Sequence, residues 1–290
     1  IMSRNAANVY VKALFKPKQY NVTINSGNGG QASIDPTLGP WEHFQVYPIT
    51  ATPDLGYHFT NWTGNANSIN TLTSPISDAN NSIAIVNDVN LTANFSLSNY
   101  NISVSVASGD GNVTGGGTFT INDSPQLNAI ASTGWHFSHW SGDVFALNSN
   151  SSLSTTVNLS NYPQNISVQA HFARNSYSIN VVTDGNGTVN GLSNLTLNPV
   201  FEDIIELNAT ASSGWEFNQW YGYPLNNPQS ESISFSASSN LDLNASFQRK
   251  NYSLIIANSL FGESNGSGLY PYESNITITT VPNAGYNFSG

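Results

Sequence analysis

The chain has no cysteine, few basic residues and no long hydrophobic run. The absence of cysteine from all 290 residues excludes a disulfide framework and a thiolate metal site. Only 7 residues are Lys or Arg, against 17 Asp or Glu, and the formal net charge is −10. Because 7 cations are too few to cover a phosphate backbone, we expect no nucleic-acid partner. No apolar run approaches the roughly 20 residues of a membrane span, and we expect no membrane insertion within this segment.

What the chain does contain is typical of a folded protein. Hydrophobic residues make up 39% of it and aromatic residues 11%, which is too rich for a disordered chain. Asn, Ser, Thr and Gly supply most of the polarity, because charged residues are only 8%. The sequence therefore predicts packed cores beneath a polar surface of low charge.

Three landmarks recur in fixed order about every 75–80 residues. The first is an opening pattern, Tyr-x-apolar-x-apolar, followed by a pair of glycines. The second is Gly-[Tyr/Trp]-x-Phe-x-x-Trp, and the third is a closing pattern, apolar-x-apolar-x-Ala-x-Phe. The signature positions of these landmarks are Tyr20, Gly56, Phe59, Trp62, Phe95, Tyr100, Gly134, Phe137, Trp140, Phe172, Tyr177, Gly214, Phe217, Trp220, Phe247 and Tyr252.

The landmarks divide the chain into tandem units. We expect residues 1–15 to form the C-terminal strand of a preceding repeat, and residues 252–290 to be a truncated repeat D. Because the pattern starts and stops within a unit, we expect a piece of a longer chain in which residue 291 is Trp. Between these ends, the complete repeats and the linkers are repeat A (20–95), repeat B (100–172) and repeat C (177–247), with linkers 16–19, 96–99, 173–176 and 248–251.

The hydrophobic pattern has a period of two. Tyr100, Ile102 and Val104 alternate with polar residues, which indicates strands with one buried and one wet face. The sequence thus predicts a mainly β fold, a tandem array of small β-grasp-like or β-sandwich-like repeat domains of about 75–80 residues. The glycine pairs suit hairpin turns with positive φ. We expect the signature Phe of each repeat to fill the core, while the signature Trp either joins the core or forms an exposed platform.

Together these residues resemble a known family. The order of opening strand, glycine pair, [Leu/Ile]-x-Ala-x-x-x-x-Gly-[Tyr/Trp]-x-Phe-x-x-Trp and Leu-x-Ala-x-Phe is similar to the divergent internalin-B-type B-repeat of bacterial surface proteins, over nearly the whole chain. The resemblance implies small β-rich units strung as stalks in large secreted or cell-surface proteins, and no catalytic residues. The sequence departs from the usual form in its charge-poor surface and in the long stretches after each Trp.

Candidate sites for chemistry are sparse. His136 and His139 flank Phe137 in one repeat only, whereas a metal needs three or four converging ligands, so we expect no metal site there. Asp110 and Asp184 lie in glycine turns. A turn is the better interpretation of both, and a calcium loop is the alternative. Scattered carboxylates at the junctions between repeats are a second place where calcium could bind. The acids are dispersed, no nucleophile motif occurs, and we expect no enzyme activity and no cofactor.

The cations gather at the linkers. Five of the seven lie in or beside the four-residue junctions, namely Lys16, Lys18, Arg174, Arg249 and Lys250. They either pair with carboxylates of a neighbouring repeat or remain solvated. A linker of four residues is too short for neighbouring units to tumble freely.

The leading hypothesis is a structural one. We expect a non-enzymatic stalk or fibre segment of an extracellular, cell-surface bacterial protein such as an adhesin or appendage. Its partners would be neighbouring repeats or other copies of the same chain, including lateral assembly into a multi-chain filament. The alternative is a multivalent carbohydrate-binding array that contacts glycans or another cell surface with one Trp platform per repeat, at Trp62, Trp140 and Trp220.

Overall fold

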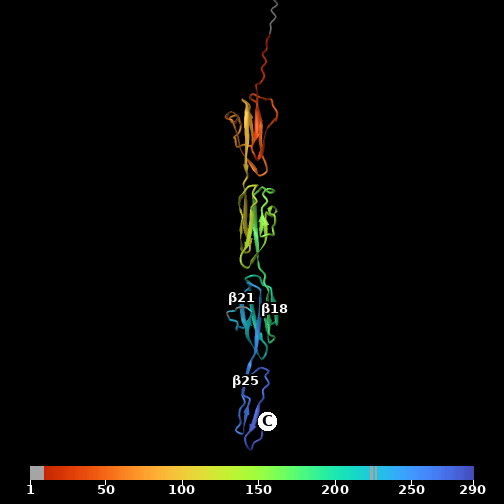
Figure 1. Ribbon diagram of the computed structural model, residues 1–290, viewed down its shortest axis with the longest axis vertical. Helices are drawn as coiled ribbons and strands as arrows, with labels where there is room; N and C mark the ends of the chain where they lie inside the picture. Colours follow the sequence, from red (N-terminus) through yellow and green to blue (C-terminus); the bar gives the residue numbers. More distant parts are fainter. Residues whose placement is uncertain (1–9, 223–224, 226) are drawn as a thin grey trace, which may run out of the picture. The chain divides into compact units, whose positions relative to one another are not determined.

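The computed structural model describes residues 10–222, 225 and 227–290. Nearly all regular structure in these residues is β-strand (Figure 1); the helical elements are α1 (Ala66–Ile69) and the 3-10 turn η1 (Val144–Ala146). The predicted mainly β tandem array is confirmed. Two sheets of strands share the core of each complete repeat, and the four-residue α1 packs beside that core in repeat A through Ile69. The repeats therefore take the β-sandwich-like form.

The chain falls into two compact units, and their boundary does not follow a linker. The first unit holds residues 1–107, 112–130 and 138–171, which are repeat A and most of repeat B. The second holds residues 108–111, 131–137 and 172–290. One end of repeat B therefore groups with repeats C and D.

Repeat A contains two sheets and a short strand pair. The sheets have the orders β2-β8-β6 and β3-β5-β7, and β1 pairs with β4. The opening strand β2 runs parallel to the closing strand β8, and β6 runs antiparallel to β8. The strand bounds are β1 (Gln19–Tyr20), β2 (Val22–Ser26), β3 (Gly30–Ile34), β4 (Trp41–Glu42), β5 (Val46–Pro53), β6 (Tyr57–Gly64), β7 (Asn80–Ala84) and β8 (Val89–Leu97).

Repeat B repeats this plan with a fourth strand in the first sheet. Its sheets have the orders β11-β9-β15-β13 and β10-β12-β14. The opening strand β9 again neighbours the closing strand β15. The bounds are β9 (Tyr100–Ser108), β10 (Gly111–Thr114), β11 (Gly117–Phe119), β12 (Gln126–Ala131), β13 (Trp135–Gly142), β14 (Ser154–Thr156) and β15 (Ile166–Arg174).

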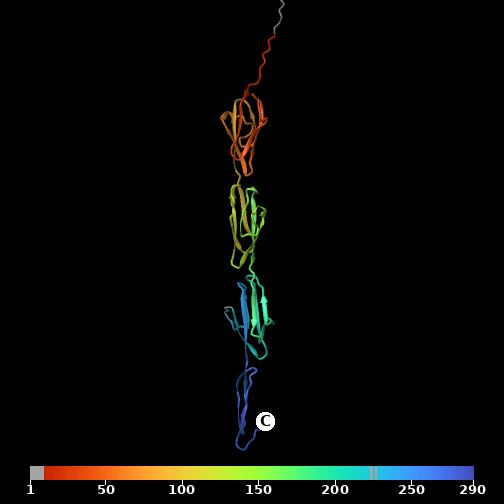
Figure 2. The same ribbon diagram turned by 45° about the vertical axis from the view of Figure 1, so that its right-hand side comes forward.

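Repeat C has the same two sheets as repeat B, in the orders β18-β16-β22-β20 and β17-β19-β21. Figure 2 shows its strands lying alongside one another. The opening strand β16 is parallel to β22, with Ile179 opposite Leu241. The bounds are β16 (Ile179–Thr183), β17 (Gly187–Val189), β18 (Asn194–Leu197), β19 (Ile204–Ala211), β20 (Trp215–Tyr221), β21 (Ser232–Ser236) and β22 (Leu241–Arg249).

Repeat D forms only the first half of this arrangement. Its strands make two separate pairs, β23-β25 and β24-β26, both antiparallel. Residues 252–290 therefore contain no equivalent of β20, β21 or β22. The bounds are β23 (Asn251–Leu254), β24 (Gly262–Asn265), β25 (Gly268–Pro271) and β26 (Thr279–Pro282).

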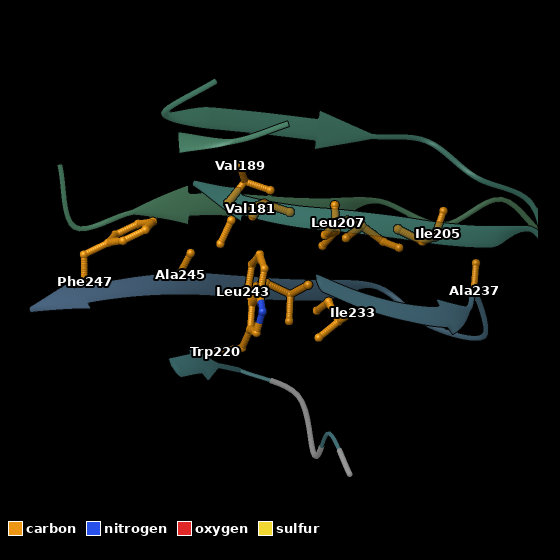
Figure 3. Packing of buried hydrophobic residues seen from close by; sticks show 12 residues of the cluster. Val181, Val189, Ile205, Leu207, Trp220, Ile233, Ala237, Leu243, Ala245 and Phe247 are labelled. Atoms are coloured by element: carbon orange, nitrogen blue, oxygen red, sulfur yellow. The ribbon is translucent and has the colours of Figure 1, made fainter. Parts of the chain in front are cut away.

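The core of each complete repeat lies between its two sheets. In repeat C the alternating residues Ile179, Val181, Leu243 and Ala245 are each at most 2% exposed. Figure 3 shows side chains of the two layers pointing into the shared interior, with Leu207 among them. Period-two alternation thus places the apolar residues where the sequence predicts, because successive strand side chains point to opposite faces.

Three local expectations need correction. The glycine turn after the opening strand is not a hairpin, since β2 and β3 lie in different sheets; the neighbouring position of β2 is taken by the parallel strand β8. Gly29 does have the expected positive φ, at 94°. The closing strands also extend into the predicted linkers, where β8 continues to Leu97. Residues 10–15 form no strand and lie exposed, residues 1–9 lie outside the described residues, and the assignment of residues 1–15 to a preceding repeat stays a prediction.

Candidate functional site: the aromatic motif

The Gly-[Tyr/Trp]-x-Phe-x-x-Trp motif forms the strands β6, β13 and β20. In repeat A, Phe59 lies opposite Phe95 and Trp62 opposite Ala93, with a β-bulge between Phe59 and Asn61. Two strand residues three apart ordinarily point to opposite faces, and one extra residue at a bulge returns them to the same face. The rings of Phe59 and Trp62 accordingly lie with centroids 5.6 Å apart. The spacing of three in the motif is therefore the signature of a bulge.

The bulge recurs in repeat C, between Phe217 and Gln219. The Phe217 and Trp220 centroids are again 5.6 Å apart. The closing Phe adds an edge-on ring contact, with Phe217 and Phe247 centroids 5.8 Å apart at 76°. Such T-shaped pairs add about 0.5–1.5 kcal/mol beyond buried area. Repetition of both geometries makes this cluster a property of the motif.

The signature tryptophans are the most enclosed aromatic residues in the part of the chain that the structure describes. Trp62 is 0% exposed, Trp140 1% and Trp220 2%. A ring this deeply buried presents no face to a sugar, so the prediction of an exposed Trp platform at these three positions is wrong. The phenylalanines of this motif, Phe59, Phe137 and Phe217, are half-buried, and Phe59 and Phe217 pack against the cores of their repeats. Because the bulge turns the Phe and the Trp to the same face, both rings contribute to the core.

Each tryptophan also anchors the stretch that follows it. The indole Nε1 of Trp62 donates to the Asp78 carbonyl at 3.0 Å, and its backbone N–H donates to the Ile76 carbonyl at 2.8 Å. In the second sheet, the N–H of Ala51 donates to the Ala79 carbonyl at 2.9 Å. The segment after the motif is therefore held by donors from both sheets, which closes one edge of the sandwich.

The same anchor occurs in the other complete repeats. Trp140 Nε1 donates to the Ser152 carbonyl at 2.9 Å, and Trp220 Nε1 donates to the Ser230 carbonyl at 3.0 Å. The backbone carbonyl is the constant element, so the identity of the residue that supplies it is free to vary. This explains how stretches of different sequence follow the same Trp. The sequence gives no sign of this anchor, because a backbone acceptor leaves no residue pattern.

The histidines of repeat B lie on strand faces. His139 and His171 stack with centroids 4.4 Å apart, and His171 Nε2 also bonds Ser141 Oγ at 2.8 Å. His136 Nδ1 lies 2.9 Å from Oδ1 of Asn175. These contacts place His136 and His139 in separate interactions. Over the described ranges, no cluster of three or more potential ligating side chains gathers for a metal ion.

The glycine-turn carboxylate of repeat C has a structural role. Oδ2 of Asp184 accepts from the Phe247 N–H at 2.7 Å and from Ser246 Oγ at 3.2 Å. It thereby ties the turn after the opening strand to the end of the closing strand. These bonds agree with the interpretation of Asp184 as a turn residue.

Among the elements of the part that the structure describes, no helix is long and apolar enough to span a membrane.

Comparison with known proteins identifies the family. The sequence profile described as "Divergent InlB B-repeat domain" matches residues 20–99, 100–176, 177–251 and 252–290 in succession. The chain belongs to this family. The four matches begin at Tyr20, Tyr100, Tyr177 and Tyr252, the opening tyrosines of the sequence pattern. InlB-type repeats occur in bacterial surface proteins and are generally non-enzymatic.

The B-repeat chain also has similarity to a solved structure, "The Bacillus anthracis TIE protein". The match has a TM-score of 0.36 and 8% sequence identity, and it covers 89% of this chain and 60% of that one. The chain thus spans less than two thirds of that protein, and a similarity this weak supports no functional argument. No curated protein sequence matches the B-repeat chain.

Proposed function

We propose that this B-repeat chain is a load-bearing stalk segment of a bacterial surface protein. The observation that supports it is the parallel pairing of the first and last long strands of a repeat. In repeat C, Ile179 to Thr183 pair in register with Leu241 to Ala245, running in the same direction. Repeat A has the same parallel pairing, in which Val22 to Ser26 pair in register with Val89 to Ala93.

Parallel terminal strands determine how a pulling force acts. The chain enters such a pair at one end and leaves it at the other, so tension on the two ends runs along the strands. The hydrogen bonds of a parallel ladder join the two strands sideways. Sliding one strand past the other must therefore strain several bonds at once, whereas an antiparallel pair pulled from one end opens bond by bond. This geometry suits a repeat that carries tension.

The composition of the surface supports the same role. Only 7 Lys and Arg residues in 290 leave few sites for trypsin-like proteases on an exposed segment. Each complete repeat encloses its own apolar cluster, as repeats A and C do. In arrays of such units, the stability is approximately the sum of each repeat's own stability and of its interfaces with its neighbours, so the repeats can unfold one at a time.

Single-molecule force spectroscopy of the chain tests the proposal. We expect one unfolding event for each complete repeat. Each event should lengthen the chain by somewhat less than about 240 Å, since some 70 extended residues span about 3.3–3.6 Å each. The order of events would then report the relative mechanical strength of repeats A, B and C.

A matched pair of variants separates mechanical from thermodynamic stability. Leu243→Ala removes a 2% exposed side chain from the terminal strand β22, and Leu207→Ala removes a 1% exposed one from β19 in the other sheet. Both should lower the free energy of unfolding by about 2–5 kcal/mol. Only Leu243→Ala should strongly lower the unfolding force of repeat C. Equal loss of force in both variants, or unfolding of the native repeats without resistance, contradicts the load-bearing role.

A further inference from the structure

A glycine at one end of each complete repeat contacts a residue of the next repeat. Gly56, Gly134 and Gly214 open the aromatic motif with φ of 81°, 80° and 80°. A Cβ added to Gly56 would lie 2.6 Å from the side chain of Ile121. A Cβ at Gly134 would overlap the ring of Phe201, and one at Gly214 the ring of Tyr272. In each case the contacted residue belongs to the following repeat and to the same compact unit.

The three contacted residues occupy equivalent positions. Each comes shortly before the long strand of the second sheet or its counterpart in repeat D. Phe201 and Tyr272 are each followed by a Glu with positive φ, 68° at Glu202 and 61° at Glu273. We call Ile121, Phe201 and Tyr272 the knob residues, and the three glycines the sockets. All three knob residues are half-buried.

The linker joins the socket to the knob by backbone hydrogen bonds. The N–H of Asn175 donates to the Gly134 carbonyl at 2.8 Å, and the Asn175 carbonyl accepts from the Phe201 N–H at 2.8 Å. Lys250 does the same between Gly214 and Tyr272, at 2.9 and 2.8 Å. One linker residue therefore bonds to both repeats, which satisfies its backbone donor and acceptor.

The linker between repeats A and B makes the corresponding bond to its socket glycine. The N–H of Ser98 donates to the Gly56 carbonyl at 2.8 Å. At the joint between repeats B and C, the Arg174 guanidinium adds further bonds, to the Phe201 carbonyl at 3.0 Å and the Asp203 carboxylate at 3.1 Å. Arg174 is thus a junction cation that does pair with a carboxylate of the adjacent repeat. This ion pair is partly exposed, so it adds little to the joint by itself.

Repeat D provides an internal comparison. Gly285 has the same motif position and a φ of 88°, yet no heavy atom of the described chain lies within 4 Å of its added Cβ. Gly56 and Gly214 are buried and Gly134 is half-buried, whereas Gly285 is exposed. The left-handed turn is therefore intrinsic to the motif, while a socket glycine is covered, fully or in part, where a following repeat supplies a knob.

We infer that the motif glycine is a docking site for the next repeat of the same chain, and that docking couples the stabilities of the two repeats. The partner is thus a second copy of the repeat that presents an apolar or aromatic side chain after its third strand. Glycine is required twice over, because the turn needs positive φ and the knob leaves no room for a Cβ. This inference concerns neighbouring repeats and does not depend on the stalk function.

The sharpest test compares two Gly→Ala substitutions of equal backbone cost in the full chain. Gly134 and Gly191 have φ of 80° and 84°, but an added Cβ at Gly191 meets nothing within 4 Å. Hydrogen exchange at Asn175 and Phe201 reports the joint. We expect Gly134→Ala to raise exchange at both amides by at least ~10-fold, and Gly191→Ala to leave them unchanged. Equal effects of the two substitutions overturn the inference.

A double-variant cycle covers the case in which Gly134→Ala unfolds repeat B itself. Phe201→Ala empties the socket without touching the glycine, and it should accelerate exchange at Asn175 while the core amide of Val168 in repeat B stays protected. Removing the ring also makes room for a Cβ, so in the Phe201→Ala background Gly134→Ala should cost less than it does alone. Strictly additive effects, or unchanged exchange at Asn175 in Phe201→Ala, overturn the coupling.

Discussion

The opening strands of repeats C and D have nearly the same pattern, Tyr177-Ser-Ile179-Asn-Val181 and Tyr252-Ser-Leu254-Ile-Ile256. In repeat C, Ile179 is 0% and Val181 1% exposed. In repeat D, Leu254 and Ile256 are only half-buried, and Tyr252 is 51% exposed. The same local pattern thus gives a core strand in one repeat and a partly wet strand in the other.

The difference lies in what pairs with the opening strand. In repeat C, β16 lies between β18 and β22, whereas β23 of repeat D pairs with β25 alone. The strand β25 comes soon after β23 in sequence, but β22 is 62 residues beyond β16 at paired positions such as Asn180 and Asp242. Local pairing therefore forms the first half of a repeat, and the distant closing strand supplies the burial.

Completing repeat D should have the largest effect on this comparison. We would extend the chain after Gly290 with residues 220–249 of repeat C, which supply the Trp, its anchored segment and the closing strand. The added strand should pair with β23 and bury Leu254 and Ile256. We expect hydrogen exchange at these amides to slow by ~100-fold or more, as for core strands of a stable unit.

The control for this extension carries Asn at its positions 241, 243 and 245, which removes the apolar face of the closing strand. It should leave exchange in repeat D unchanged. Equal protection by both extensions would mean that chain length, and not strand pairing, stabilises the repeat.

Trp220→Ala should move repeat C toward the state of repeat D. The substitution empties the centre of the cluster in Figure 3 and removes the indole donor to the Ser230 carbonyl. We expect the free energy of unfolding of repeat C to fall by about 3–5 kcal/mol, measured by urea titration with hydrogen exchange to localise the loss. Tyr221→Ala, at the adjacent 48% exposed position, is the control and should cost less than about 1 kcal/mol.

The smallest of these effects concerns a glycine that only a complete repeat requires. A Cβ at Gly187 would overlap the ring of Phe247 from the closing strand. Gly187→Ala should therefore lower the stability of repeat C by about 1–3 kcal/mol through overpacking. In a Phe247→Ala background the same substitution should be nearly neutral in a urea titration. A persistent cost there would assign the need for glycine to the backbone.

Much of the fold could be predicted because it follows from local sequence patterns, namely alternation and recurrence. Alternation in Tyr100, Ile102 and Val104 identifies a strand, and recurrence identifies the repeats. The candidate site was harder to predict. An aromatic repeat at Trp62 is compatible with a core or with an exposed platform, and the choice depends on the bulge between Phe59 and Asn61. A bulge changes which face a side chain occupies without changing its identity.

By itself, the sequence determined the number and order of the repeats, their β character and their family, because periodicity and spacing are properties of the chain. Only the tertiary structure decided that the turn after the opening strand crosses between sheets, that the tryptophans are enclosed, and that the ring of Phe201 packs against Gly134. Each of these depends on contacts between residues far apart in the chain. Such contacts are set by backbone pairing and available space, which leave no mark on either residue alone.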